Sequence, residues 1–215
     1  MGNPILVELM RGTQQESLHR GAIAVARANG ELIAAAGELE HPIFPRSGIK
    51  PLQALPLLET GAADRYAFGP RELAITCGSH SGTPEHAATV ATMLALAGLD
   101  AAALGCGTQE PLDAAASREL VRAGLAATAL HHNCSGKHAG MLATAAHKAE
   151  PIDAYWLPEH PVQIRIRQTL EAMTGRGLGA DVRGIDGCSV PNWALPLANL
   201  AAAFARFVTG EGVPR

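Results

Sequence analysis

The sequence predicts an α+β fold in which short antiparallel strands come first and helices follow. Up to about residue 37, the chain holds short apolar runs separated by turns, and after Ser47 it becomes rich in alanine and leucine. This order is typical of α+β folds rather than of a regular βαβ alternation. With 215 residues, of which 47% are hydrophobic and 17% charged, the chain is long enough to bury one core, so we expect a single domain over residues 1–215.

Three strands are predicted near the N-terminus. They correspond to "ILVELM", "GAIAVARA" and "ELIAAA", at residues 5–10, 21–28 and 31–36. Asn29-Gly30 lies between the second and the third and is typical of a two-residue hairpin turn. We therefore expect an antiparallel sheet of these three strands.

Helices are predicted over most of the remaining chain. Thr83 is a suitable N-cap and Pro84 suits the first helical position, so one helix is expected to begin there. The predicted helical windows lie near residues 50–60, 70–76, 84–98, 113–123, 135–148, 159–174 and 191–208.

Composition and charge exclude several classes of partner. The formal net charge of -3 provides no basic field that would attract nucleic acid or an anionic membrane. No apolar run reaches the length of a membrane span, and Glu8 and Arg11 interrupt the first apolar stretch, which is unlike a signal peptide. The four cysteines contain no C-x-x-C pair, which argues against a disulfide framework. We expect a cytoplasmic location.

Ser47 and Lys50 form the first candidate catalytic pair. At a helical i, i+3 spacing, both side chains lie on one face, where the amine could reach the hydroxyl. A lysine can activate a serine nucleophile if burial or a nearby cation such as Arg46 lowers its pKa. With seven serines and three lysines in the chain, S-x-x-K is expected by chance only roughly 0.1 times.

A second candidate is "TCGSHSG", in which Ser79, His80 and Ser81 stand between two glycines after an apolar segment. Tight backbone with exposed hydroxyls is common in active-site loops. Glycine and serine are equally the usual residues of ordinary turns. The pattern is not the G-x-S-x-G nucleophile elbow, because no strand-turn-helix alternation surrounds it.

A third candidate combines "HHNCSGKHAGM" with "GIDGCSVPNW". Cys134, Lys137 and His138 would share one face at a helix start, and Cys188 follows Asp186 in a glycine-flanked turn. Two thiolates with nitrogen ligands nearby suit Zn²⁺. The alternative is that both cysteines are small buried hydrophobic residues.

Five segments in order carry a resemblance to a known family: "LMRGTQQESLHRG", "HPIFPRSGIKPLQALPL", "TCGSHSGTPEH", "HHNCSGKHAGML" and "GIDGCSVPNWALPL". Together they closely resemble the asparaginase II family over nearly the whole chain. The resemblance implies a fold like that of serine β-lactamases and serine-dependent glutaminases, in which S-x-x-K opens a helix against an antiparallel sheet.

The resemblance also implies roles for individual residues. Ser47 and Lys50 match the first serine-lysine pair of the family, with Arg46 beside them, and Ser79 matches a second catalytic serine.

The other matched positions concern metal and substrate. Cys134, Lys137 and Cys188 match residues that bind a zinc ion near the pocket. Asp186 and His138 match positions that hold the substrate or order the site. A lysine that ligates zinc must be neutral, and the metal would assist binding more than perform hydrolysis.

The expected activity is hydrolysis of L-asparagine to L-aspartate and ammonia. Two alternatives stay open: a glutaminase or other Ser-Lys acyltransferase, and a zinc-stabilised binding module in which Ser47 is only a helix cap. Lys50 favours an enzyme, because capping does not require it and base catalysis does.

One departure concerns the end of the chain. Members of the family are longer, and the lysine partner of the second serine, on a glycine-rich segment, has no counterpart before "FVTGEGVPR". The resemblance therefore predicts a domain incomplete at its C-terminus. Apolar strands with unpaired edges are expected to associate, and a homodimer is predicted.

Overall fold

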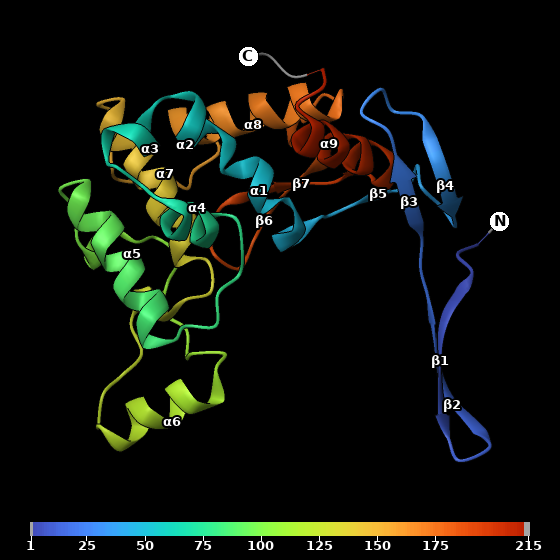
Figure 1. Ribbon diagram of the computed structural model, residues 1–215, viewed down its shortest axis with the longest axis horizontal. Coiled ribbons are helices and arrows are strands. Elements are labelled where there is room, and N and C mark those ends of the chain that lie inside the picture. Colours follow the sequence, from blue (N-terminus) through green and yellow to red (C-terminus); the bar gives the residue numbers. More distant parts are fainter. Residues whose placement is uncertain (1, 213–215) are drawn as a thin grey trace. The chain divides into compact units, whose positions relative to one another are not determined.

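The computed structural model describes residues 2–212, which divide into two compact units (Figure 1). The first unit contains the chain up to residue 44, residues 171–182 and the chain from residue 193 onward. The second contains residues 45–170 and 183–192. Helices and small antiparallel strands are both present, which is compatible with an α+β fold.

The strands of the first unit form separate two-stranded ladders instead of the predicted three-stranded sheet. An unpredicted strand follows the first one after a tight turn, in which Gly12 has a φ of 61°. Its sequence, "QQESLHR", is polar and lacks the apolar alternation that marks a strand. The antiparallel pairs are β1 (Ile5–Arg11) with β2 (Gln14–Arg20), β3 (Ile23–Ala26) with β4 (Leu32–Ala36), and β5 (Pro42–Ile43) with β8 (Leu195–Pro196).

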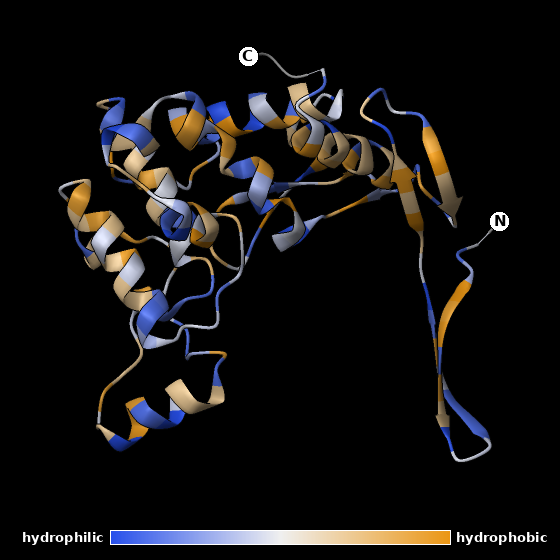
Figure 2. Ribbon diagram, viewed as in Figure 1, coloured by the Kyte–Doolittle hydropathy of each residue, from blue (hydrophilic) through white to orange (hydrophobic). Residues whose placement is uncertain are grey.

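Helix α9 (Leu197–Thr209) packs against β3. The Arg206 guanidinium donates hydrogen bonds to the carbonyl oxygens of Ala28, at 2.8 Å, and Met173, at 2.7 Å. The predicted helix over 191–208 therefore begins too early, because short strands and Pro196 precede α9. The strands contain many apolar residues, drawn in orange in Figure 2. The side chains of several of them are exposed, namely those of Ile5, Leu6, Val7, Leu9, Met10, Ile23, Val25, Leu32 and Ile33.

The second unit is mainly helical. Pro56 lacks the N–H that a continuous helix needs, so the predicted helix near 50–60 is divided in two. Thr83 caps the next long helix as predicted, with its hydroxyl accepting a hydrogen bond from the His86 N–H. The helices are α1 (Lys50–Gln53), α2 (Leu55–Glu59), α3 (Ala62–Arg65), α4 (Pro70–Thr76), α5 (Pro84–Leu96), α6 (Ala114–Arg122), α7 (Ser135–His147) and α8 (Pro161–Thr174), of which the last continues into the first unit.

Two strands, β6 (Arg183–Ile185) and β7 (Pro191–Trp193), flank a turn at residues 186–190. Asp186 N–H donates to Val190 O at 2.9 Å, and Ser189 N–H donates to Asp186 O at 2.8 Å. These bonds hold Cys188 inside a compact turn. In residues 2–212, no helix combines the length and the apolar character needed to cross a bilayer.

Helix α7 is the centre of the second unit and is buried from Ser135 to Ala145. It approaches α4 closely because glycine faces α4 at two positions. A Cβ atom at Gly136 would overlap the Ile75 carbonyl, and one at Gly140 would lie 2.9 Å from a Thr76 methyl group. The close approach brings the loop after α4 beside the first turn of α7.

Candidate active site

Lys50 is at the centre of the candidate site. It opens α1, is only 1% exposed, and its amine lies 2.8 Å from Ser79 Oγ, 3.0 Å from Gly78 O and 3.4 Å from Asn133 O. A neutral amine has two N–H groups and one lone pair, whereas a carbonyl oxygen can only accept. Two donated bonds to the carbonyls leave the lone pair to accept the Ser79 hydroxyl hydrogen. This is the arrangement that a serine nucleophile and its base require.

Burial is the main cause that lowers the pKa of Lys50 below its usual 10.5. The charges act in both directions, since Cys134 raises that pKa and Lys137 lowers it. The net direction favours the neutral amine, which is the form that can accept a proton from serine.

Ser47 lies in a 3₁₀ turn (Arg46–Ile49) directly before α1, and its side chain is exposed. Within residues 2–212, no hydrogen bond joins Ser47 Oγ to the Lys50 amine. The expected contact is replaced by Ser79, because the Lys50 side chain runs into the protein interior while Ser47 stays at the surface. Both residues still line one cavity of about 290 Å³, together with Arg46, Gln109, His132, Asn133, Cys134, Asp186, Gly187 and Cys188.

An ion pair forms part of this cavity. Arg46 Nε lies 2.6 Å from Asp186 Oδ1, and Asn192 Nδ2 donates to Asp186 Oδ2 at 3.0 Å. Arg46 and Ser189 both adopt positive φ angles, of 50° and 74°, which are unfavourable for residues with a side chain. Strained backbone on both sides of the ion pair is typical of a functional site. The pair presents a cation and an anion side by side.

Cys134, Lys137 and Cys188, which the resemblance groups as metal ligands, lie near one another. Cys134 precedes α7, and the Lys137 amine lies 3.4 Å from Cys188 Sγ. A hydrogen bond from the Cys188 thiol is the first cause that lowers the pKa of Cys134 to about 5, and it raises the pKa of Cys188. These opposite directions favour a thiolate at Cys134 and a thiol at Cys188, and binding of a metal ion would have to displace the remaining proton.

The donor set can be compared with the ligands that zinc prefers. Thiolate sulfur and neutral nitrogen suit this ion. In the described part of the chain, however, no three His, Cys, Asp or Glu side chains are grouped so that they could hold a metal ion. Two thiolates and an amine fit zinc on the condition that Lys137 coordinates as a neutral third ligand.

His138 is placed differently from the expected substrate contact. It is completely buried, and its Nδ1 accepts a 2.5 Å hydrogen bond from the Tyr155 hydroxyl, which itself accepts from Gly105 N–H. Burial lowers the pKa of His138 to about 4, so the ring is neutral. The ring is not among the described residues that line the cavity, because α7 directs it into the core. Its placement suits ordering of the site.

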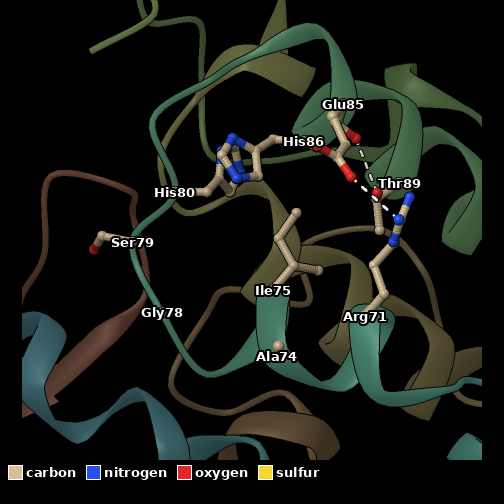
Figure 3. A pocket seen from close by; sticks show the side chains of 9 residues that line it. All are labelled: Arg71, Ala74, Ile75, Gly78, Ser79, His80, Glu85, His86 and Thr89. Atoms are coloured by element: carbon tan, nitrogen blue, oxygen red, sulfur yellow. Dashed lines mark hydrogen bonds and ion pairs between the residues drawn. The ribbon is translucent and has the colours of Figure 1, made fainter. Parts of the chain in front are cut away.

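Ser79 lines a different cavity, of about 360 Å³ (Figure 3), and is not among the described residues that line the cavity of Lys50. Its side chain is exposed and points away from the His80 and His86 rings, which lie on the other side of the loop. The Arg71–Glu85 ion pair, with 3.2 Å between Arg71 Nη2 and Glu85 Oε1, forms part of that cavity. Ser79 is therefore accessible while its hydroxyl is held by Lys50.

Two residues of the site were missed by the sequence reasoning. The Asn133 carbonyl binds the Lys50 amine, and the Asn133 N–H donates to Gln109 Oε1 at 3.3 Å. The position of Asn133 directly before Cys134 was a usable signal. Gln109 carried none, because it lies in a loop far from the other motifs in sequence.

The site thus places a buried lysine amine within hydrogen-bond distance of the hydroxyl of an exposed serine. Comparison with protein-family models gives a match to L-asparaginase II over residues 7–215. The chain belongs to this family, as its motifs predicted, and the family indicates an amidohydrolase of the asparaginase type that acts on a small molecule. A search of curated protein sequences finds no match.

Proposed function

We propose that the protein hydrolyses the side-chain amide of L-asparagine to L-aspartate and ammonia. The observation that carries the proposal is the 2.8 Å hydrogen bond between the amine of Lys50, 1% exposed, and the hydroxyl of Ser79, which is exposed. Lysine side chains are rarely buried unless their amine has hydrogen-bond partners. Here the carbonyl oxygens of Gly78 and Asn133 accept the amine hydrogens, which leaves the lone pair directed at the Ser79 hydroxyl. Membership of the L-asparaginase II family supports the choice of substrate.

In the proposed mechanism, Ser79 Oγ attacks the amide carbon while Lys50 takes the hydroxyl proton. Lys50 then protonates the leaving ammonia, and an acyl-enzyme remains on Ser79. Water attacks this ester with Lys50 again as base, which releases aspartate and restores the serine. Backbone N–H groups near the serine would stabilise the tetrahedral oxyanion, at about 3 kcal/mol per donor. Ser47, in the same cavity as Lys50, is the second candidate nucleophile.

We assign substrate recognition to the ion pair in the cavity. Free asparagine carries an α-carboxylate and an α-ammonium group. Arg46 can bind the first and Asp186 the second, and these two groups are already 2.6 Å apart in the cavity that contains Ser47 and Lys50. Asn192 holds the Asp186 carboxylate from behind. His138 would act by ordering the neighbouring thiols, not by contact.

Zinc remains part of the proposal. Cys134, Lys137 and Cys188 would hold the ion, and its charge would favour a nearby carboxylate or oxyanion. Lys50 and Ser79 carry the proton transfers with or without this contribution.

The decisive experiment is an assay of ammonia release from L-asparagine, with L-glutamine in parallel. We expect activity on L-asparagine, loss of at least about two orders of magnitude in Ser79→Ala, and inactive Lys50→Arg, because a guanidinium cannot serve as base. Ser47→Ala tests the second serine. Preference for L-glutamine would favour the glutaminase alternative. Folded protein that is inactive on both substrates would favour the non-catalytic module and contradict the proposal.

A further inference from the structure

His80 takes part in a hydrogen-bond chain whose direction is determined by its end groups. Gly82 N–H can only donate, so His80 Nδ1 accepts this 3.1 Å bond. Ser135 Oγ donates to Leu130 O at 2.9 Å, so it accepts the 2.8 Å bond from His80 Nε2. The ring must therefore be neutral, with its hydrogen on Nε2. Burial supports the neutral form, since it lowers the pKa of His80 to about 4.

The chain of bonds joins the two segments that surround the Lys50 amine. One segment, residues 78–82, contributes the carbonyl of Gly78 and the hydroxyl of Ser79. The other, residues 130–135, contributes the carbonyl of Asn133. Besides its ring contacts, His80 donates a hydrogen bond from its backbone N–H to Asn133 O at 3.2 Å. The same carbonyl oxygen therefore accepts hydrogen bonds from the His80 backbone and from the Lys50 amine.

The backbone is closely packed at Gly82. Gly82 has a φ of 72°, and a Cβ atom there would lie 2.7 Å from the His131 carbonyl oxygen. The loop therefore passes closely over the segment before α7, and the His80 ring fills the remaining space at 7% exposure. Figure 3 shows the ring on the side of the loop opposite to the Ser79 side chain.

We propose that His80 is a positioning residue, which holds the Ser79 hydroxyl on the lone pair of Lys50 by joining the Ser79 loop to the start of α7. Without the ring, the two segments separate or slide, and the acceptors of the Lys50 amine no longer direct its lone pair at Ser79. A displacement of about 1 Å at a reacting group can reduce the rate about 100-fold. The proposal rests on the proposed role of Ser79 as nucleophile.

The chain contains a matched control. His160 has the same local arrangement, in which Nδ1 accepts the N–H of Val162 at 3.2 Å and Nε2 donates to Pro151 O at 2.8 Å. Its exposure, 8%, is close to the 7% of His80. His160 lies outside both cavities around Ser79 and Lys50, so its replacement removes equivalent contacts without touching the Ser79 loop.

The test uses the full chain and a serine-directed fluorophosphonate, with mass spectrometry to measure the rate of labelling at Ser79. We expect His80→Ala to lower this rate by about 100-fold and to lower kcat on L-asparagine with little change in KM. His80→Gln places an amide nitrogen near the former Nε2 and should recover at least part of the loss. His160→Ala should match His80→Ala in thermal stability but label at the wild-type rate. If His80→Ala does not fold, Ser135→Ala removes the acceptor of the His80 Nε2 hydrogen bond, together with the Ser135 bond to Leu130 O, and should slow labelling in the same direction.

Several outcomes would overturn the proposal. These are equal labelling rates in His80→Ala and His160→Ala, a His80→Gln variant no faster than His80→Ala, or ¹⁵N chemical shifts that place the His80 hydrogen on Nδ1. Wild-type protein that is not labelled at Ser79 would also overturn it. Wild-type protein that is labelled there but releases no ammonia from L-asparagine would contradict the proposed substrate, while the labelling rates would still decide the role of His80.

Discussion

Replacement of Lys50 by methionine should separate stability from activity. Methionine fills a similar volume without a charge. It removes the hydrogen bonds of the amine to Gly78 O and Ser79 Oγ, but the exposed Ser79 hydroxyl can bind water instead, and Asn133 O keeps the His80 N–H. A buried carbonyl without a partner costs about 1–3 kcal/mol. Removal of an amine that is 1% exposed recovers part of its desolvation penalty. The free energy of unfolding should therefore change by no more than about 2 kcal/mol.

The effect on turnover should be much larger. General base catalysis contributes typically about 10²–10⁴ in rate, which corresponds to about 3–5 kcal/mol of transition-state stabilisation. Ammonia release, coupled to NADH oxidation by glutamate dehydrogenase, measures turnover, and urea denaturation measures stability. Lys148→Met is the matched control, because Lys148 is exposed at the end of α7. This variant should keep both its turnover and its stability.

The reasoning would be refuted by Lys50→Met protein that keeps more than about a tenth of wild-type turnover, since a proton acceptor cannot be removed at so small a cost. It would equally be refuted if Lys148→Met lost as much activity as Lys50→Met, because the loss would then reflect a general effect of removing positive charge.

Three further predictions follow from the packing, the buried histidine and the thiols. Gly136→Ala should lower the free energy of unfolding by about 1–3 kcal/mol, because the new methyl group overlaps the Ile75 carbonyl; urea denaturation that shows no loss would contradict the packing. His80 has a pKa of about 4 in the folded chain and 6.5 when unfolded, so the unfolded state binds more protons between these values and stability should fall by about 3 kcal/mol as the pH drops through that window. The same slope in His80→Gln would show that other groups cause it. Elemental analysis should find about one zinc per chain, and Cys134→Ser or Cys188→Ser should abolish it; equal zinc in all three proteins would exclude these ligands.

The sequence predicted features that depend on neighbouring residues. Thr83 and Pro84 mark the start of α5 because capping needs only a side-chain oxygen and a fixed φ within one turn. Prediction from neighbouring residues was wrong at two other places. It missed β2, because the polar residues of this strand pair with β1 without forming an apolar face. It also gave one helix where Pro56 divides the segment into two. In the candidate site, the resemblance grouped Cys134, Lys137 and Cys188, and the structure brings these three residues together.

Tertiary structure decided which serine Lys50 meets. The S-x-x-K spacing places Ser47 near Lys50 along the chain. The Lys50 side chain is buried, however, and its amine forms a hydrogen bond with Ser79, which is 29 residues away in sequence. That contact depends on the close approach of α7 to α4 at Gly136, a distance that no spacing within one helix encodes. His138 was expected to hold the substrate or to order the site, and its complete burial, which depends on the packing of α7, favours the second role. Local spacing determines which side chains can share a face, whereas the packing of elements distant in sequence determines which of them meet and which are accessible to substrate.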